Sequence, residues 1–247
     1  MYRLFNELAH RYDLHTPAHH YQDDHAFAVE WARRWGRSCR LLDVGCGTGV
    51  FLEKARKAGI NAVGIDASPG MVREAEARLD AGAVSLQRME EVEAQQAYHA
   101  IVSLSWSLNY CAGYEALAEV LLRFYRALLP GGGLLLQVAH AAHTDGRLLE
   151  DREAGPGGEP DDIILLYRFQ GTGGPEDGLL AEYVYACKSS RELLHEQHSL
   201  RVANARAVAE RVRQAGFTDV ELFDSFRQDA FVGSPSPFIV GYRPKSG

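Results

Sequence analysis

The chain has 247 residues, of which 46% are hydrophobic and 24% are charged, and its formal net charge is −7. These values suit one globular domain with a full core. The negative charge argues against nonspecific binding to nucleic acid or to anionic membranes, because both need basic surfaces. No apolar run is long enough to span a bilayer, and MYRLFNELAHRYD does not read as a signal peptide. The four scattered cysteines form no CxxC pair, so we expect free thiols in a reducing cytoplasm.

The first 38 residues mix aromatic residues with histidines and become helical in AFAVEWARRW. We expect residues 1–38 to form an N-terminal helical lid. The stretch HTPAHHYQDDH holds residue types that can bind metals, but Pro17 interrupts a regular helical spacing. A polar lid is therefore favoured over a metal site, and no metal is expected.

Strands and helices alternate from residue 39 onward. Five apolar runs predict buried strands, over residues 40–44, 61–66, 83–89, 99–106 and 133–140. Helical patterns separate three pairs of them, over residues 50–59, 68–79 and 114–131. Ser68 is a suitable N-cap for the second helix, and Pro130 with Gly131 is expected to end the third. This alternation predicts an α/β fold, a parallel sheet with helices on both faces.

The pattern changes after a Gly/Pro-rich loop, EAGPGGEPDD. Residues 162–170, 179–188 and 194–202 predict three antiparallel strands, and GTGGPEDG predicts the first turn between them. A helix capped by Asn204 and two closing strands, over residues 220–226 and 237–243, complete the chain. We therefore expect one domain over residues 39–247, interrupted by an antiparallel β insert at about residues 160–202.

A glycine-rich turn, LLDVGCGTG, joins the first strand to the first helix. Such a turn lets backbone amides approach a ligand closely and points a helix N-terminus at it. Gly45, Gly47 and Gly49 have the spacing GxGxG, whereas the dinucleotide fingerprint is GxGxxG. No lysine follows, as it would in a phosphate-binding loop, so a pyrophosphate ligand is disfavoured.

Two acidic residues narrow the identity of the ligand. Asp66 ends the second strand about 20 residues past the glycines, where a carboxylate can bind a ribose diol. Asp43 precedes the first glycine and would repel phosphates, yet it suits a cationic ligand. S-adenosylmethionine carries a ribose, an ammonium group and a sulfonium but no phosphate, so both acids favour it as the cofactor.

The segment from Leu41 to Gly133 resembles the class I S-adenosylmethionine-dependent methyltransferases, in DVGCGTG, GID, SPGMVREAEARL and LLPGGGLLLQV. The resemblance implies a Rossmann-like sheet of seven strands with only the last antiparallel. It also implies that the loop binds the methionine part, that Asp66 binds the ribose, and that Met89 and Glu90 lie near the adenine. The expected cofactor contacts are Tyr21, Asp43, Gly45, Cys46, Gly47, Gly49, Asp66, Ala67, Met71, Met89, Glu90, Leu104 and Ser105.

The residues after the fourth strand, SWSLNYC, bear on the substrate. They lack the D/N-PP-Y/F motif of adenine-N6 methyltransferases and the acidic metal ligands of metal-dependent catechol methyltransferases. The chain also has no Pro-Cys, the dipeptide that carries the nucleophilic cysteine of cytosine-C5 methyltransferases. Small-molecule methylation on nitrogen, oxygen or carbon remains, and we expect nitrogen or oxygen. Trp106, Asn109 and Tyr110 are candidate substrate contacts, because the pocket begins where this strand ends.

A shorter resemblance covers both ends of the chain. AHRYD with Tyr21, and an insert ending in HSLR before an AGF helix, are similar to amino-sugar N-methyltransferases and glycine N-methyltransferase-like enzymes. The likeness implies that Tyr12 and Tyr21 line the cofactor's methionine end, and Tyr12 is a candidate catalytic residue that orients the methyl group or the nucleophile. An amine acceptor must be neutral and a hydroxyl needs a base. His140 and His143 are the candidate bases beyond the fifth strand, with His19 and His20 as alternatives in the lid.

Three interpretations stay open. The first is a methyltransferase acting on a small metabolite, a sugar or a natural-product intermediate. The second is a nicotinamide-dependent oxidoreductase on a similar sheet, which the GxGxG spacing disfavours. The third is a catalytically silent protein that binds S-adenosylmethionine. The expected partner is a small-molecule substrate, without nucleic acid or membrane, and the sequence leaves a homodimer open.

Overall fold

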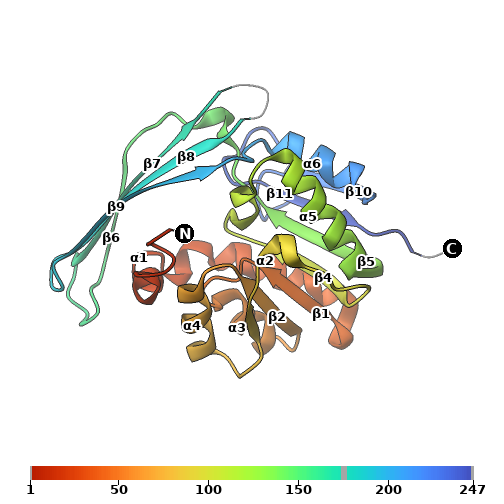
Figure 1. The fold of residues 1–247 in the computed structure, drawn as a ribbon, viewed down its shortest axis with the longest axis horizontal. Helices are drawn as coiled ribbons and strands as arrows, with labels where there is room; N and C mark the ends of the chain where they lie inside the picture. The colour runs from red at the N-terminus through yellow and green to blue at the C-terminus, as the bar shows by residue number, and fades with distance from the viewer. Residues whose placement is uncertain (1, 174–176, 246–247) are drawn as a thin grey trace.

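The computed structural model describes residues 2–173 and 177–245, which form a large central sheet and a smaller sheet beside it (Figure 1). The central sheet has seven strands in the order β10-β11-β5-β4-β1-β2-β3. They are β1 Arg40–Val44, β2 Asn61–Asp66, β3 Val84–Leu86, β4 Tyr98–Ser103, β5 Leu128–Gln137, β10 Thr218–Phe223 and β11 Phe238–Tyr242. Only β11 runs antiparallel to its neighbours. The predicted seven-stranded α/β fold is confirmed.

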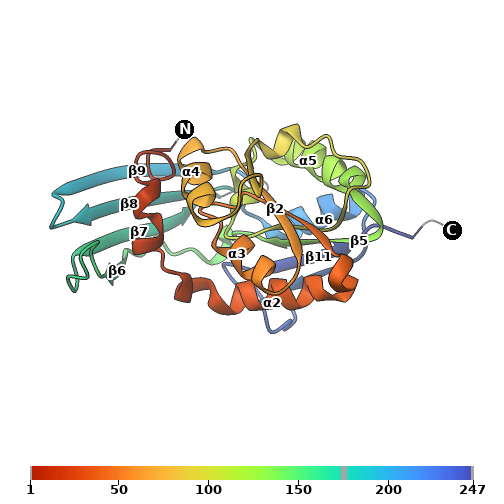
Figure 2. The ribbon, with the colours of Figure 1, turned by 90° about the horizontal axis from the view of Figure 1, so that it is seen from below.

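Helices cover both faces of this sheet (Figure 2). α2 (Gln22–Ala32), α3 (Val50–Lys57) and α4 (Pro69–Arg78) share one apolar core with the sheet, and α5 (Tyr114–Ala127) and α6 (Ala205–Gln214) share the other. The expected caps are present, since the Ser68 side chain accepts a hydrogen bond from Met71 N and the Asn204 side chain accepts from Arg206 N.

The smaller sheet projects away from the central one (Figure 1). Its four antiparallel strands are β6 Leu149–Glu153, β7 Ile163–Gly171, β8 Leu179–Cys187 and β9 Glu192–Leu200. Leu4 and Leu8 from the chain's start pack on its buried face, against Ile163, Leu165 and Tyr185. The sheet therefore forms a core with a segment more than 150 residues away in the sequence.

Short helical pieces dominate the first 38 residues: η1 Ala9–Arg11, α1 Tyr12–His15, η2 Ala18–Tyr21 and η3 Arg33–Ser38, besides α2. η1 and α1 lie between the smaller sheet and α4 (Figure 2). Asn6 fastens them to α4, because its Oδ1 accepts hydrogen bonds from Ser68 Oγ at 2.9 Å and from Gly70 N at 3.3 Å. Three further 3-10 turns follow strands of the central sheet: η4 Met89–Glu91, η5 Ser107–Tyr110 and η6 Ala141–His143.

Several predicted element boundaries were wrong. α5 ends at Ala127, before Pro130, because Leu129 precedes a proline and joins β5 instead. β4 ends at Ser103 and not at residue 106, since Ser105 and Trp106 take positive φ angles. The third strand stops at residue 86, and the 3-10 turn η4 follows it.

The insert begins earlier than residue 160, because β6 (Leu149–Glu153) adds a fourth strand to it. The sequence LEDRE has almost no β-forming residue, so only its pairing with β7 makes it a strand. The predicted turn over residues 171–178 includes residues 174–176, which lie outside the described residues. The four cysteines are free, and all four are buried. Among the described helices, none has the length and apolar character needed to cross a membrane.

Candidate active site

The site lies where the parallel strands of the central sheet end. β1 has β2 on one side and β4 on the other, so the connections after these strands diverge and leave a crevice. A cavity of about 900 Å³ occupies it. The glycine loop, the end of β2 and the turn after β4 line one part of this cavity, and the N-terminal segment and the insert line the rest.

The glycine loop needs its glycines for backbone geometry. Gly45, Gly47 and Gly49 have φ angles of +77°, +55° and +80°, which L side chains rarely adopt. A Cβ on Gly45 would lie 2.4 Å from Ser107 Cβ, whereas a Cβ on Gly47 would meet nothing within 4 Å. Gly47 thus leaves room beside the cavity that it lines, and Gly49 caps α3 without lining it.

Asp66 holds the loop in place and also faces the cavity. Its Oδ2 accepts a hydrogen bond from Gly47 N at 2.9 Å, and its Oδ1 accepts from Ser68 N at 2.8 Å. A carboxylate has about four lone-pair positions, so each oxygen can accept one more bond, as a ribose diol would require. Burial raises the pKa of Asp66, and these two backbone bonds oppose that shift.

Asp43 lines the same part of the cavity and is almost fully buried. Burial, with the nearby Asp66 charge, raises its pKa to about 8. A proton therefore neutralises Asp43 near pH 7 while no cation is close. A cationic ligand beside it would favour the ionised form, so this carboxyl suits the ammonium or sulfonium of the expected cofactor.

The N-terminal segment closes the cavity over the loop. Thr48 Oγ1 donates a 2.6 Å hydrogen bond to Asp13 Oδ1, and Arg78 also pairs with Asp13. Tyr12 and Tyr21 both line the cavity. Burial raises the pKa of Tyr12 to about 12, so its hydroxyl stays protonated.

His15 also lines the cavity and is 1% exposed. Its Nδ1 lies 2.9 Å from Thr16 Oγ1, but its Nε2 has no hydrogen-bond partner among the described residues. Burial lowers the pKa of His15 to about 4, so the ring is neutral. A buried nitrogen without a partner is unfavourable, and a bound ligand could supply one.

The remaining expected cofactor contacts surround one end of the cavity. Its lining includes Cys46, Ala67, Met71, Met89, Glu90, Leu104 and Ser105. Met89 and Glu90 lie on η4, directly after the shortened third strand. These side chains, with Asp43, Asp66 and the open space at Gly47, suit a nucleoside cofactor without phosphate.

The three candidate substrate residues have different positions. Trp106 and Tyr110 line the cavity, and Trp106 Nε1 donates a 2.9 Å hydrogen bond to Ser236 Oγ. Asn109 does not line it. This amide is fully buried and exchanges hydrogen bonds with the backbone of Ala139, at 3.0 and 3.4 Å. The structure therefore gives Asn109 a role in joining η5 to the end of β5.

His140, an expected base, does not line the cavity. Its Nδ1 accepts a 3.3 Å hydrogen bond from Ala205 N at the start of α6, and its ring packs edge-on against Phe231. The side chain of His143, the other expected base, lies outside the described residues. His140 is therefore held at the start of α6 and not at the cavity wall.

Sequence reasoning missed an aromatic wall. Its rings come from the start of the chain and from the insert: Tyr2, Phe5, Tyr167, Phe169 and Tyr183. Behind it lies His198 on β9, fully buried, with Nδ1 2.7 Å from the Tyr110 hydroxyl. A signal was present, because strand periodicity places Glu196 and His198 of HEQHS on one face. Nothing local, however, indicated that this face meets the cavity.

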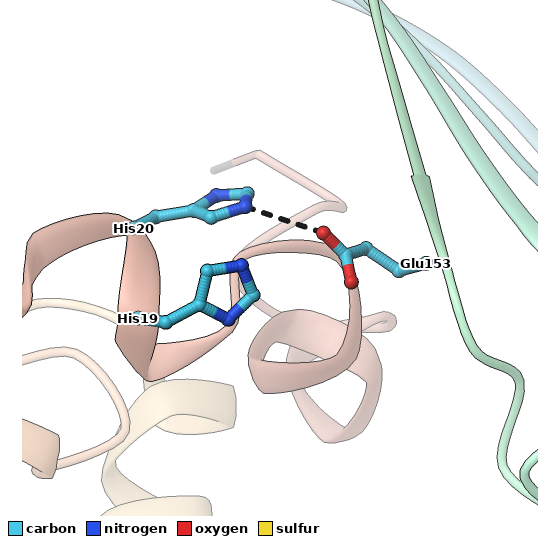
Figure 3. Close-up of side chains that lie close together, drawn as sticks. All are labelled: His19, His20 and Glu153. Carbon is cyan, nitrogen blue, oxygen red and sulfur yellow. Dashed lines mark ion pairs between the residues drawn. The ribbon is translucent and has the colours of Figure 1, made fainter.

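Histidines of the N-terminal segment meet the insert at the edge of the cavity (Figure 3). His20 Nε2 lies 3.2 Å from Glu153 Oε1. Ligand atoms of His19, His20 and Glu153 lie within 4.8 Å of one another, so this group could hold a divalent cation. Without one, the His20–Glu153 contact links the N-terminal segment to β6.

A family model described as "Methyltransferase domain" matches residues 10–222. Among curated proteins, one of Geobacillus sp. (strain WCH70), named as a methyltransferase, is 29% identical over 153 residues, which are 60% of this chain and 62% of that protein. The match thus spans less than two thirds of that relative's length.

Two solved structures share the fold. A S-adenosylmethionine-dependent methyltransferase from Clostridium acetobutylicum ATCC 824 aligns with a TM-score of 0.75 and 14% identity, over 97% of this chain and 98% of that one. The sugar N-methyltransferase KedS8 from Streptoalloteichus sp ATCC 53650 aligns with a TM-score of 0.69 and 23% identity, over 90% and 88%.

Proposed function

Since the chain belongs to the methyltransferase domain family, we propose that it moves the methyl group of S-adenosylmethionine to a nitrogen of a small amino sugar or a related amine. The cavity itself carries this proposal. One end holds Asp43, Asp66 and the glycine loop, and the other end is a wall of tyrosine and phenylalanine rings. Ligand cavities commonly measure about 300–1,000 Å³, so a cavity of about 900 Å³ can hold a nucleoside cofactor together with a small acceptor.

Each group of side chains has a task in this reaction. S-adenosylmethionine, when bound, supplies an electrophilic methyl group. Asp66 would accept hydrogen bonds from the ribose, and Asp43 would balance the positive charge of the ligand. The tyrosine-rich wall would hold a cationic or neutral amine through ring faces and hydroxyl groups. The N-terminal segment would cover the site and help to hold the acceptor in line with the methyl group.

The amine is preferred to a hydroxyl for two reasons. The aromatic wall suits an ammonium group, and the solved sugar N-methyltransferase shares this fold over 90% of the chain. Oxygen methylation is the second candidate, because Tyr110 presents a hydroxyl to the cavity and could orient an alcohol as well. The family match leaves the nicotinamide interpretation without support.

Two measurements test the proposal. Calorimetry should show binding of S-adenosylmethionine and none of nicotinamide dinucleotide. Mass spectrometry should then detect methylated products and S-adenosylhomocysteine when the chain is incubated with amino hexoses, free and as nucleoside-diphosphate sugars. Binding without product from any amine or alcohol would indicate a catalytically silent protein and would refute the proposed activity.

A further inference from the structure

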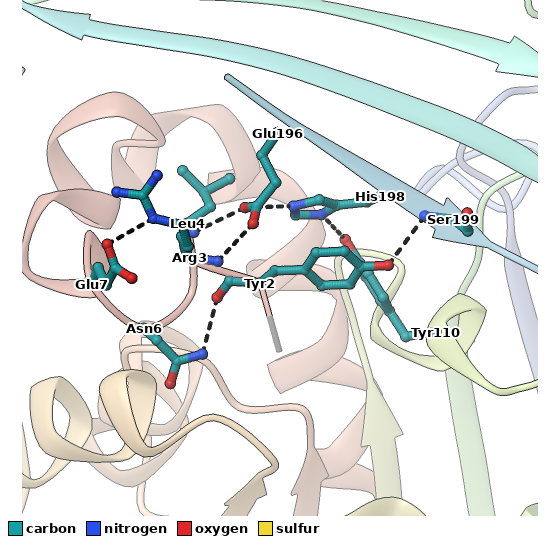
Figure 4. Close-up of polar contacts among 9 residues, drawn as sticks. All are labelled: Tyr2, Arg3, Leu4, Asn6, Glu7, Tyr110, Glu196, His198 and Ser199. Atoms are coloured by element: carbon teal, nitrogen blue, oxygen red, sulfur yellow. Dashed lines mark hydrogen bonds and ion pairs between the residues drawn. The ribbon is translucent and has the colours of Figure 1, made fainter. Parts of the chain in front are cut away.

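A hydrogen-bonded chain of three side chains leads from the cavity into the protein (Figure 4). The Tyr110 hydroxyl, at the cavity wall, lies 2.7 Å from His198 Nδ1. His198 Nε2 lies 3.0 Å from Glu196 Oε2. His198 is 0% exposed, so its ring reaches the cavity only through Tyr110.

The hydrogen bonds fix the direction of every proton in this chain. Glu196 is ionised, because hydrogen bonds from Leu4 N, His198 and Arg3 N lower its pKa although burial raises it. Burial lowers the pKa of His198, against the effect of Glu196, so the ring is neutral near pH 7. A carboxylate only accepts, hence Nε2 carries the proton and Nδ1 is the acceptor. The Tyr110 hydroxyl therefore donates to Nδ1 and turns its lone pairs toward the cavity.

We propose that Tyr110, His198 and Glu196 form a proton relay that deprotonates the acceptor amine. The inference rests on the proposed function. The ammonium N–H of the acceptor gives its proton to Tyr110 Oη, and the Tyr110 proton passes to His198 Nδ1. The amine then has a free lone pair for the methyl group, and His198 becomes an imidazolium paired with Glu196. The proton leaves to solvent after product release, which restores the neutral ring.

Charge and burial support a relay over direct proton transfer to tyrosine. Burial, with the nearby Tyr183, Tyr12, Tyr2 and Glu196, raises the pKa of Tyr110 well above 10, so a stable phenolate is disfavoured. Tyr110 stays neutral during the transfer, because it gives its own proton to His198 at the same time as it takes one from the acceptor. Glu196 stabilises the resulting imidazolium in a site without water contact for the ring.

The N-terminal segment completes the relay. Glu196 accepts hydrogen bonds from Arg3 N at 2.7 Å and Leu4 N at 3.0 Å. The Tyr2 ring stacks on His198 with centroids 3.8 Å apart. Glu196 and Tyr2 are thus positioning residues, and the relay has this geometry only while the segment covers the cavity. The groups that face His198 are Glu196, Tyr110, Tyr2, Phe5 and Tyr183.

Two substitutions test the relay on the amino hexose with the highest turnover in the acceptor panel. Tyr110→Phe removes the hydroxyl. His198→Asn keeps an acceptor oxygen near the position of Nδ1 but cannot take the proton. Each should lower kcat/KM at about pH 7 by about a hundredfold, while the Kd for S-adenosylmethionine stays within about twofold. His195→Asn is the matched control, because His195 makes a similar 2.8 Å contact with Glu182 on the exposed side of the same sheet.

The pH profile separates proton transfer from a structural role. As pH approaches the pKa of the acceptor's own ammonium, solvent deprotonates the amine and the relay becomes unnecessary. The deficit of both variants should therefore shrink to less than about tenfold near pH 9. A deficit that is equal at every pH, or a His198→Asn variant with the activity of the unsubstituted chain, would overturn the relay and leave the proposed function intact.

A spectroscopic measurement tests the relay without an acceptor. Nitrogen-15 NMR of the full chain with S-adenosylhomocysteine should show His198 protonated on Nε2 alone near pH 7, and Tyr110→Phe should shift the Nδ1 resonance. Protonation on Nδ1 would overturn the inference. If the unsubstituted chain methylates no amine, the proposed function fails, and the relay fails with it whatever the NMR result.

Discussion

The two halves of the cavity wall are built in different ways. One half holds the glycine loop, Asp43 and Asp66; we propose that it binds the cofactor and call it the cofactor half. It comes from consecutive βα units, and its contact from Gly47 N to Asp66 Oδ2 joins residues 19 positions apart. The other half holds the aromatic wall; we propose that it binds the acceptor and call it the acceptor half. It comes from segments distant in the sequence, since Glu196 on β9 accepts a hydrogen bond from Arg3 N, 193 positions away. The geometry of the cofactor half thus depends on residues close together in the sequence, whereas the acceptor half depends on how remote segments pack.

The largest effect that would test this comparison is expected in the acceptor half. Leu4 is 3% exposed and packs on the insert. Leu4→Ala should therefore weaken the docking of the N-terminal segment on the insert by about 3 kcal/mol of free energy. Hydrogen exchange over residues 2–16 should accelerate and the KM for the acceptor should rise. Leu193→Ala, at a 72% exposed position of β9, is the control and should change neither. Uniformly faster exchange over the central sheet would show that the two halves are not separable.

The next effect concerns the cofactor half. Asp66→Ala removes the acceptor for two backbone amides and for the ribose, so S-adenosylmethionine should bind about 2 kcal/mol more weakly. Calorimetry measures this change, and the affinity of Asp66→Asn for the cofactor should lie between that of the unsubstituted chain and that of Asp66→Ala. Asp80→Ala is the control, because Asp80 is exposed and pairs only with Arg56 in the contacts seen here. Unchanged affinity for the cofactor would refute the assignment of the ribose to Asp66.

A third prediction links stability to pH in the cofactor half. Asp43 has a folded pKa of about 8, above the unfolded value of about 3.9. The folded chain therefore holds a proton that the unfolded chain releases, and stability falls as pH rises from about 4 to about 8. Asp43→Asn should raise the free energy of unfolding by about 2 kcal/mol at pH 7 and by less at pH 5, as denaturant titration would measure.

The same substitution should weaken cofactor binding, because asparagine cannot balance the positive ligand. Binding to the unsubstituted chain should also release a proton near pH 7, which calorimetry in buffers of different ionisation enthalpy detects. A stability gain that does not depend on pH would mean that Asp43 is ionised in the empty cavity.

The smallest effect is expected at the junction of the two halves. Glu153→Gln removes the ion pair with His20, and both side chains are partly exposed, so the change should be about 0.5 kcal/mol or less and should vanish in high salt. Denaturant titration at low and high salt measures it. In high salt, added zinc should make the unsubstituted chain more stable than Glu153→Gln only if His19, His20 and Glu153 bind the ion together. A larger loss of stability that persists in high salt would mean that this contact contributes strongly to holding the two halves together.

The sequence alone determined the central fold and the cofactor half. Alternating strands and helices, the caps Ser68 and Asn204, the GxGxG loop and Asp66 are local features, because hydrogen bonding and backbone angles within about 25 residues decide them. The wrong boundaries of α5 and β4 in the central fold also have local causes. α5 ended before Leu129 because of the following proline, and β4 ended where Ser105 turned.

Only the tertiary structure decided which side chains line the proposed acceptor half of the cavity. His140 follows a strand of the central sheet as a base would, yet the start of α6 takes up its Nδ1. His198 lies on a strand with no distinctive motif, yet the packing of Tyr2 and Leu4 on the insert buries it behind Tyr110. Burial against a distant segment sets the neighbours, hydrogen bonds and pKa of such a group, and no spacing along the chain encodes that contact.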